Sequence, residues 1–414
     1  MFLKPSQISA EPLSLGSLDC DLVIVGGGIV GATLACGLKN SGLRVRIIEP
    51  QRQVEALNRR QAYALTLQTG RILSKIGPWD QILPGISTFH QISLSDGDHP
   101  GIVEFTPQDL GTEELGYVGE HHVLLGALQE YLQDCSNVQW HCPAHVVGVH
   151  YLENWAEVEL TEAGEFLTLR TRLVVAADGA RSELRQAAGI PTRGWKYWQS
   201  CIAMTIQTEK PHNNVAFERF WPSGPMGVLP LPGNRCQVVL TAPHAQAHDL
   251  QTMAASEFLK LLEYRTGGLL GKLELLSDRH LFPVQLMQSQ RYIQSRLALV
   301  GDAAHCCHPV GGQGLNMGIR DAAALAQILQ GAQERREDIG NLLVLRRYEQ
   351  WRQSENLIIL AFTDFLDRMF SGDWLPKVIL RRWSLGLLNR VKVLRYLALR
   401  IMTGLIGRPP RVIQ

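Results

Sequence analysis

The sequence predicts an α/β fold in which a Rossmann-like nucleotide-binding domain is interleaved with a mainly antiparallel-sheet domain and followed by C-terminal helices. Three stretches carry this prediction, because each joins an apolar, strand-like run to glycines or an acid and then to a helical pattern. They are residues 20–39, 173–188 and 296–329. Short alternating runs between the second and third stretches are typical of antiparallel strands.

The composition limits the classes of protein to which the chain can belong. Its 414 residues, 45% hydrophobic and 19% charged, suffice for two domains with an extension. A formal net charge of +1 gives no general case for binding nucleic acid. The eight cysteines form no CxxC pair, which favours a reducing compartment. We expect no secretory signal in residues 1–19 and no membrane-spanning helix, and therefore a cytoplasmic protein.

The first stretch matches the dinucleotide-binding fingerprint in its usual context. An apolar strand leads into GGGIVG at 26–31, a helical pattern follows, and the next strand ends in Glu49. Gly26 allows the tight turn, Gly28 lets the backbone approach a pyrophosphate, and Gly31 lets the helix pack on the strand. Glu49 is placed to accept from the hydroxyls of a ribose. The loop alone does not separate FAD from NAD.

Two arginines, Arg59 and Arg60, precede a helix expected at 66–76. Two interpretations stay open for them: they face the phosphates or ring of a cofactor, or they belong to a solvated helix start.

The second stretch is an apolar strand that ends in Asp178 and Gly179. Open α/β sheets bind ligands at the carboxyl ends of their strands, which favours a cofactor-facing role for Asp178. The pattern of Ser182 followed by Glu183 also predicts an ordinary helix N-cap. Both interpretations can hold together.

The third stretch places a strand, an acid and a glycine-rich loop ahead of an apolar helix. Gly301 and Asp302 follow the strand, where a carboxylate can accept from ribityl or ribose hydroxyls. Glycines ahead of a helix expose backbone N–H groups, and the helix dipole favours negative charge there, as a reduced flavin requires at its N1–C2=O edge. The alternative is a loop that merely turns the chain. The loop residues singled out are Pro309, Gly311, Gly312, Gln313, Gly314, Leu315 and Asn316.

The middle of the chain predicts an inserted antiparallel sheet that serves as a lid or substrate platform. Its aromatic side chains could line an apolar cavity, although a core position is the better expectation for any one of them. They are Trp195, Tyr197, Trp198, Phe217, Phe220 and Trp221. The expected nucleotide-binding domain comprises 19–85, 114–190 and 286–345, the substrate domain 86–113 and 191–285, and the C-terminal helical segment 346–414.

The cluster His305-Cys-Cys-His308 has the residue types of a metal site. Neighbouring residues in one short loop cannot easily surround one ion, so we expect no metal.

These motifs together resemble the para-hydroxybenzoate hydroxylase superfamily of FAD-dependent monooxygenases. Within it, the chain is most similar to the ring hydroxylases of ubiquinone biosynthesis. The resemblance covers roughly residues 19–370 and rests on GGGIVG, ADGARS at 177–182 and GDAAHCCHPVGGQGLN at 301–316. The subfamily likeness rests on YWQS at 197–200, WPSGPMGVLPL at 221–231 and TDFLDRMF at 363–370.

The resemblance implies FAD as cofactor and assigns the motif residues to it. The glycines of the first loop and Glu49 match the ADP-binding motif, Asp178 and Gly179 an Asp-Gly motif, and Gly301 with Asp302 the ribityl-binding pair. Residues 309–316 match the loop beside the flavin ring. Relatives usually carry Arg-x-x-Ala-Leu where Gln61 stands here, so the contact expected from that arginine is shifted to Arg60 or lost.

The implied activity is hydroxylation of the aromatic ring of a polyprenylated phenol or quinone precursor. FAD would be reduced by NAD(P)H or another donor and would react with O2 to a flavin C4a-hydroperoxide. The resemblance assigns no side chain as a catalytic base. Another flavoenzyme of this fold, such as a prenyl reductase or epoxidase, and an FAD-bearing scaffold among other quinone-biosynthesis proteins are the alternatives.

The C-terminal segment predicts contact with a membrane surface. Residues 374–408 contain no acid, and as one helix they would gather most of their basic side chains within an arc of about 140°. Such a helix is typical of a peripheral protein on an anionic membrane. Ser384, Gly386 and Asn389 favour two shorter helices instead, and basic helices packed on the body of the protein are the alternative.

Overall fold

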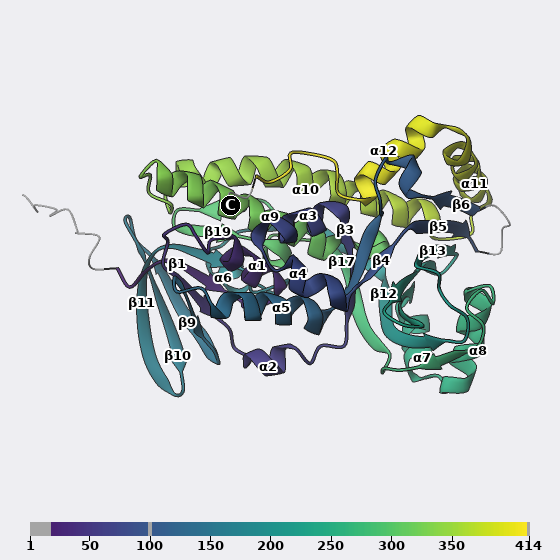
Figure 1. The fold of residues 1–414 in the computed structure, drawn as a ribbon, viewed down its shortest axis with the longest axis horizontal. Coiled ribbons are helices and arrows are strands. Elements are labelled where there is room, and N and C mark those ends of the chain that lie inside the picture. The colour runs from purple at the N-terminus through teal and green to yellow at the C-terminus, as the bar shows by residue number, and fades with distance from the viewer. Residues whose placement is uncertain (1–17, 98–101, 412–414) are drawn as a thin grey trace, which may run out of the picture.

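The computed structural model describes residues 18–97 and 102–411, and the stretch in which no secretory signal is expected lies almost wholly outside them. Figure 1 shows two sheets side by side, with long helices along one edge of the molecule. The observed mixture of helices and sheets confirms the predicted α/β class.

The first sheet has a parallel centre with the order β19-β11-β1-β2-β8. These strands are β1 (Cys20–Val25), β2 (Val45–Ile48), β8 (Val138–His141), β11 (Glu165–Ala176) and β19 (Leu297–Leu299). Antiparallel partners extend it: β9 (Ala144–Tyr151), β10 (Ala156–Glu162) and β18 (Ile293–Gln294). The carboxyl ends of β1, β11 and β19 therefore meet at one edge.

Helices pack against this centre, and the apolar side chains of its strands are buried in one core with them. They include α1 (Ile29–Gly37), α3 (Leu67–Ile76), α5 (His121–Gln133), α9 (Gln313–Glu334) and α10 (Leu342–Phe370). The Ala-rich middle of α9 is fully buried, because small side chains let it pack closely on α1. Three shorter helices lie in connections: α2 (Gln53–Ala56), α4 (Trp79–Ile82) and α6 (Glu183–Ala187).

The second sheet has the order β20-β17-β12-β15-β14-β13-β5-β6 and is antiparallel except between β13 and β5. Its strands are β5 (Gln91–Asp96), β6 (Ile102–Phe105), β12 (Thr192–Thr208), β13 (Val215–Trp221), β14 (Gly224–Leu231), β15 (Arg235–Pro243), β16 (Leu273–Leu275), β17 (His280–Ser289) and β20 (His305–Cys306). Helices α7 (His244–Thr252) and α8 (Ala255–Arg265) pack on it around a separate apolar core.

A small sheet, β3-β7-β4, joins the two halves. Its strands are β3 (Ala62–Thr66), β4 (Ser87–Phe89) and β7 (Gly116–Glu120). Short 3-10 turns complete the connections at 83–85, 107–109, 301–303 and 310–312.

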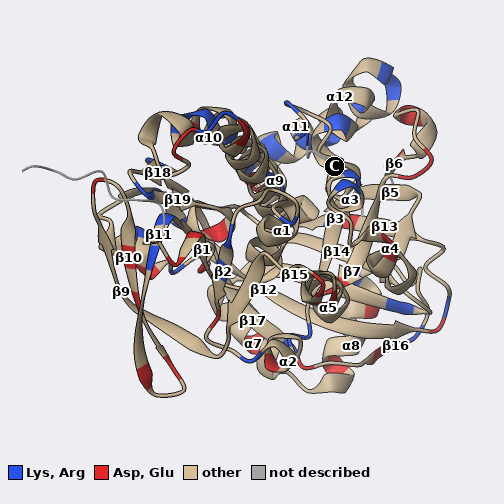
Figure 2. Ribbon diagram, turned by 60° about the vertical axis from the view of Figure 1, so that its left-hand side comes forward, with Lys and Arg blue, Asp and Glu red and all other residues tan. Residues whose placement is uncertain are grey.

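The C-terminal segment forms two helices, α11 (Leu375–Arg390) and α12 (Lys392–Met402), with the break at Val391. Both pack on the edge of the second sheet near β6 (Figure 1). Figure 2 marks the Lys and Arg positions of these helices in blue, and several of these residues pair with acids of the body. Arg381 and Arg382 form ion pairs with Asp96 at 2.7 and 2.9 Å, and Arg395 pairs with Asp109 at 2.6 Å.

The single basic helix is therefore not observed, and the two shorter helices are. Within the described part of the chain, no helix combines the length and the hydropathy that a membrane crossing requires.

Candidate active site

The first glycine loop leaves open space where a ligand would approach. A Cβ atom at Gly26 would lie 2.3 Å from the carbonyl oxygen of Ala177, and one at Gly31 would lie 2.0 Å from the carbonyl oxygen of Gly26. Both glycines are therefore required by close packing. A Cβ at Gly28 would meet nothing within 4 Å, so this part of the loop faces a space and not the protein.

Glu49 is fixed beside this loop by the backbone. The N–H of Gly27 donates to Glu49 Oε2 at 2.7 Å, and the N–H of Gln51 donates to Oε1 at 3.0 Å. The carboxylate is thus held at the end of β2, next to the loop at the end of β1, as the fingerprint predicts.

Asp178 and Ser182 both contact the start of α6. Its Oδ2 accepts from the N–H of Leu184 at 3.3 Å, while the Ser182 hydroxyl caps α6 by accepting from the N–H of Arg185 at 3.1 Å. Asp178 Oδ1 is buried and has no hydrogen-bond partner among the described residues. Burial raises the pKa of this carboxyl. A buried, unsatisfied acceptor beside the glycine loop is suited to a ligand hydroxyl.

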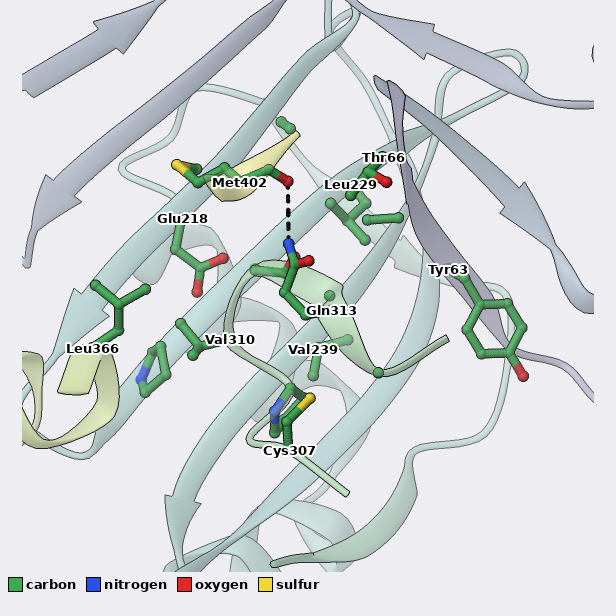
Figure 3. A pocket seen from close by; sticks show the side chains of 18 of the residues that line it. Tyr63, Thr66, Glu218, Leu229, Val239, Cys307, Val310, Gln313, Leu366 and Met402 are labelled. Carbon is green, nitrogen blue, oxygen red and sulfur yellow. Dashed lines mark hydrogen bonds between the residues drawn. The ribbon is translucent and has the colours of Figure 1, made fainter. Parts of the chain in front are cut away.

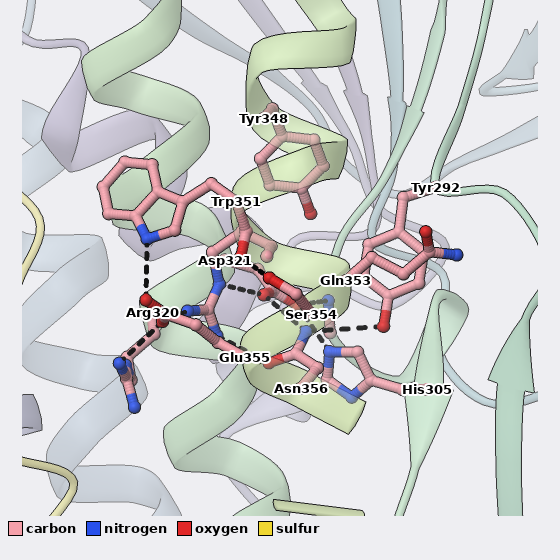
Figure 4. A network of polar contacts seen from close by, with 12 residues as sticks. Tyr292, His305, Arg320, Asp321, Tyr348, Trp351, Gln353, Ser354, Glu355 and Asn356 are labelled. Carbon is pink, nitrogen blue, oxygen red and sulfur yellow. Dashed lines mark hydrogen bonds and ion pairs between the residues drawn. The ribbon is translucent and has the colours of Figure 1, made fainter. Parts of the chain in front are cut away.

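Gly301 and Asp302 form a tight turn after β19, which a buried ion network holds in place. The N–H of Gly301, whose φ is +60°, donates to Asp321 Oδ2 at 3.2 Å. The same oxygen lies 2.5 Å from His305 Nε2, and Arg352 Nε donates to Asp321 Oδ1 at 2.8 Å (Figure 4). Although burial acts to raise the pKa of Asp321, His305 and Arg352 lower it to about 2. The turn is therefore anchored to α9 and α10 by a charged network.

The glycine-rich loop bends sharply before α9. Gly311 and Gly312 have φ values of +70° and +61°, which favour glycine, and the helix begins at Gln313. The side chain of Asn316 does not line the cavity and ties the loop to β3. Its Oδ1 accepts from the N–H of Thr66 at 2.9 Å, and its Nδ2 donates to the carbonyl oxygens of Ala64 and Gly312, each at 2.8 Å.

A cavity of about 800 Å³ connects these loops with the second sheet and the C-terminal helices (Figure 3). Nine of the predicted site residues line it: Gly28, Gly179, Asp302, Pro309, Gly311, Gly312, Gln313, Gly314 and Leu315. The remaining ones support those loops from behind or lie outside the lining: Gly26, Gly31, Glu49, Arg60, Asp178, Gly301 and Asn316. Away from the loops, the wall is almost entirely apolar.

The comparisons with known proteins agree with this geometry. Residues 19–353 match the family model described as FAD binding domain. The chain is 36% identical to the ubiquinone hydroxylase UbiL of Rhodospirillum rubrum, over 96% of this chain and 94% of UbiL. The chain belongs to this family of FAD-dependent aromatic monooxygenases.

Two further matches are an uncharacterised relative and a solved structure. The Synechocystis protein slr1300 is 52% identical over 95% of both chains. Among solved structures, the p-nitrophenol 4-monooxygenase PnpA of Pseudomonas putida DLL-E4 superposes with a TM-score of 0.79. The superposed region covers 94% of this chain and 98% of PnpA. Because the two sequences are only 20% identical, this match shows the fold alone.

The loops of this flavin monooxygenase fit FAD on their own geometry. Open space lies above Gly28, Asp178 Oδ1 is buried without a partner among the described residues, and Asp302 lines the cavity. Burial raises the pKa of Asp302, with the nearby His305 opposing the shift. Of the arginine candidates, Arg59 lines the cavity together with Gln61, whereas Arg60 is exposed and does not.

The histidine–cysteine cluster is divided between several contacts. His305 binds Asp321, and His308 Nε2 lies 3.4 Å from Asp367 Oδ1 on α10. Cys306 and Cys307 line the cavity, and burial raises the pKa of both thiols, that of Cys307 to about 12. Among the described residues, no group of His, Cys, Asp and Glu side chains is arranged to hold a metal ion.

Sequence reasoning missed Glu218 of β13, whose side chain lines the cavity from the second sheet (Figure 3). The available signal was one acid inside the aromatic run VAFERFW. Of the aromatic residues named from sequence, Phe217 and Phe220 line the cavity, and the other four do not.

Proposed function

We propose that this enzyme hydroxylates the aromatic ring of a polyprenylated phenol or quinone precursor in quinone biosynthesis. The observation that carries the proposal is one continuous apolar cavity, which begins at the cofactor loops and ends between the C-terminal helices. A phenolic head group at the loops would leave its prenyl chain to the apolar end. UbiL, named as a ubiquinone hydroxylase, supports this substrate class.

FAD would be held along the carboxyl ends of the first sheet. Gly28, Glu49 and Asp178 would contact its ADP part, and Asp302 the ribityl chain. The loop 309–315 and the N-terminus of α9 would contact the ring, where backbone N–H groups and the helix dipole favour negative charge. When bound, FAD supplies electron transfer from NAD(P)H or another donor and the activation of O2.

The second sheet and the C-terminal helices would orient the substrate and exclude water. From α10, Leu366 and Met369 line the cavity, and from α11 and α12 Leu388 and Leu397 do so. An apolar wall keeps the reacting ring out of contact with solvent, which strengthens electrostatic interactions inside and suppresses side reactions.

The same helices would rest on a membrane surface, from which such a substrate is taken. Their outward faces carry large exposed side chains, with Trp374 70%, Leu375 67%, Ile379 60%, Trp383 64% and Val393 66% exposed. Large contiguous groups of exposed apolar side chains mark surfaces that contact a partner or a membrane. Arg381, Arg382 and Arg395 pair with acids of the body. We therefore expect the exposed apolar side chains to contribute more to membrane binding than the basic side chains do.

The test is turnover by the purified, FAD-loaded enzyme with a short-chain prenylphenol and NADH or NADPH. We expect phenol-dependent O2 uptake and a product with one added oxygen atom, identified by mass spectrometry. Reductant oxidation that yields only hydrogen peroxide with every phenol tried would contradict the proposal, and so would a protein that binds no FAD.

A further inference from the structure

We propose that Glu218 is the residue that binds the ring hydroxyl of the phenolic substrate and accepts its proton during hydroxylation. The inference rests on the proposed function, because it assigns the acid–base chemistry of the same cavity. It starts from the observation that Glu218 is an acid in a part of the cavity wall that is otherwise mostly apolar.

Glu218 is the carboxylate that the second sheet presents to the cavity. The described lining residues include one further carboxylate, Asp302, which belongs to the cofactor loops. Figure 3 shows the Glu218 side chain turned toward the side of the cavity that Val310 and Gln313 form. The neighbouring lining residues Phe217, Phe220 and Leu229 are apolar. A carboxylate in such surroundings is costly unless a partner arrives, and a phenol O–H is a suitable partner.

The position of Glu218 links the substrate side to the cofactor side. The backbone amide of Gly311, in the loop beside the proposed flavin ring, acts to lower the pKa of this carboxyl, and both residues line the cavity. A phenol held by Glu218 would therefore lie at the junction of the second sheet and that loop. This is where the ring must be for reaction at the cofactor.

The ionisation of Glu218 suits a proton acceptor near neutral pH. Burial raises its pKa from 4.5 to about 7, and the Gly311 N–H opposes part of the shift. A base is most effective when its pKa lies close to the working pH. Because the carboxylate form grows as pH rises through about 7, activity should rise over the same range.

Other ionisable groups surround the cavity, and burial shifts the pKa of several of them away from neutrality. Burial raises the pKa of Tyr63 and Cys307 to about 12 and that of Cys306 further, and burial lowers the pKa of His121. Arg59 and Asp302 also line the cavity. The ionisable groups near β13 further include Cys201, the ion pairs of Asp96 with Arg381 and Arg382, and the pair of His308 and Asp367.

The proton transfer is balanced within the pair. The O–H bond of the phenol breaks, a new O–H bond forms on the Glu218 carboxylate, and the electron pair stays on the phenolate oxygen. The phenolate donates electron density into the ring, which makes the ring carbon a better nucleophile toward activated oxygen. Exchange with solvent after product release returns the carboxyl to its charged form.

The decisive variant is Glu218→Gln in the FAD-loaded enzyme. Glutamine keeps an oxygen that can accept from the Gly311 N–H, so a purely structural role survives while the proton acceptor is lost. We expect hydroxylated product to fall about 100-fold, with reductant oxidation retained and diverted to hydrogen peroxide. The rise of kcat/KM through pH 7 should disappear. Glu104→Gln, the same change at an exposed position of β6, serves as the control and should leave both unchanged.

A binding measurement keeps the assignment testable without turnover. Phenol affinity, followed by the absorbance of bound FAD, should strengthen by about tenfold as pH rises through 7 in the wild type, because a carboxylate is the stronger acceptor. The dependence should vanish in Glu218→Gln and be absent in both proteins for the O-methyl ether of the phenol.

The two failures can be told apart. A wild type that shows this pH-linked binding but hydroxylates no phenol would overturn the proposed function and leave Glu218 as the hydroxyl-binding residue. A Glu218→Gln enzyme that keeps its product yield within about threefold, or keeps the pH-linked binding, would overturn the role of Glu218.

Discussion

The two ends of the cavity are built by different means. At the cofactor end, glycines, backbone N–H groups and a buried ion network fix short loops at the carboxyl ends of parallel strands. At the substrate end, apolar side chains from the second sheet and from α10, α11 and α12 form the wall, and Glu218 is the acid that it presents.

The difference reflects what each end must recognise. A phosphate-bearing cofactor needs donors at fixed positions, which backbone geometry supplies. A flexible prenyl chain needs only volume and apolar surface, which many side-chain combinations supply. Changes at the cofactor end should therefore abolish function sharply, and changes at the substrate end should shift preference gradually.

The largest effect should come from breaking the ion network behind Gly301 and Asp302. Arg352→Leu removes the arginine that pairs with the fully buried Asp321, so part of the negative charge of Asp321 is left without a partner. We expect a loss of about 4 kcal/mol in the free energy of unfolding. Urea unfolding of the FAD-loaded protein measures it. Arg347→Leu, which removes an exposed partner of Glu337, is the matched control and should leave the unfolding curve unchanged.

The same variant should move the acid limit of stability. In the wild type the pKa of Asp321 is lowered from 3.8 to about 2, so its stabilising contribution is complete above pH 4 and is lost as pH falls toward 2. Without Arg352 this loss should begin at a higher pH. An identical acid-unfolding curve for the two proteins would show that Arg352 does not stabilise the charged form of Asp321.

The next effect concerns the first glycine loop. In Gly31→Ala the new Cβ would lie 2.0 Å from the carbonyl oxygen of Gly26, so the loop must shift. We expect FAD binding to weaken by about 100-fold, or ~2.7 kcal/mol, measured by titration of the apoprotein with FAD. Gly386→Ala, at a helical position with no neighbour within 4 Å, should bind FAD as the wild type does. Equal affinities for all three proteins would mean that the close contact at Gly31 does not shape the cofactor site.

The contrast between the two ends also explains what could be predicted from sequence. Gly26, Gly31 and Glu49 lie within one strand–helix–strand unit, where local spacing determines the fold and marks the site. Glu218 was missed because Gly311, which lines the same cavity, is far along the chain, and only the folded structure brings β13 close to the cofactor loop.

Contacts between segments that are distant in sequence, at Asn316 and Arg382, could not be predicted from the local sequence pattern. Asn316 lies in a loop motif, yet its amide ties that loop to β3 and does not line the cavity. The basic residues of the C-terminal segment predicted a cationic surface. Arg382, however, reaches Asp96 across 286 positions of sequence, and no local pattern contains that pairing.

A smaller effect is expected from narrowing the substrate end. Leu388→Trp places a larger side chain in the cavity wall contributed by α11, and we expect KM for a long-chain prenylphenol to rise about tenfold. KM for an unprenylated phenol and the affinity for FAD should not change, because the obstruction is remote from the loops. Ile379→Trp, at an exposed position of the same helix, is the control. A similar rise in KM for both phenols would place the prenyl chain elsewhere.

The smallest effect should appear at the outer face of the same helix. Trp383 is 64% exposed on α11, and Trp383→Ala should weaken binding to anionic lipid vesicles by about fivefold while leaving turnover of a short, soluble phenol unchanged. Co-sedimentation with vesicles measures it, with Leu343→Ala, 66% exposed on α10, as the control. If both variants bind vesicles equally, the exposed apolar face of α11 does not bind the membrane, and the prenyl chain enters by another route. If only Trp383→Ala is weakened, the inner and outer faces of one helix serve the same substrate, one by lining its cavity and the other by contacting the membrane that holds it.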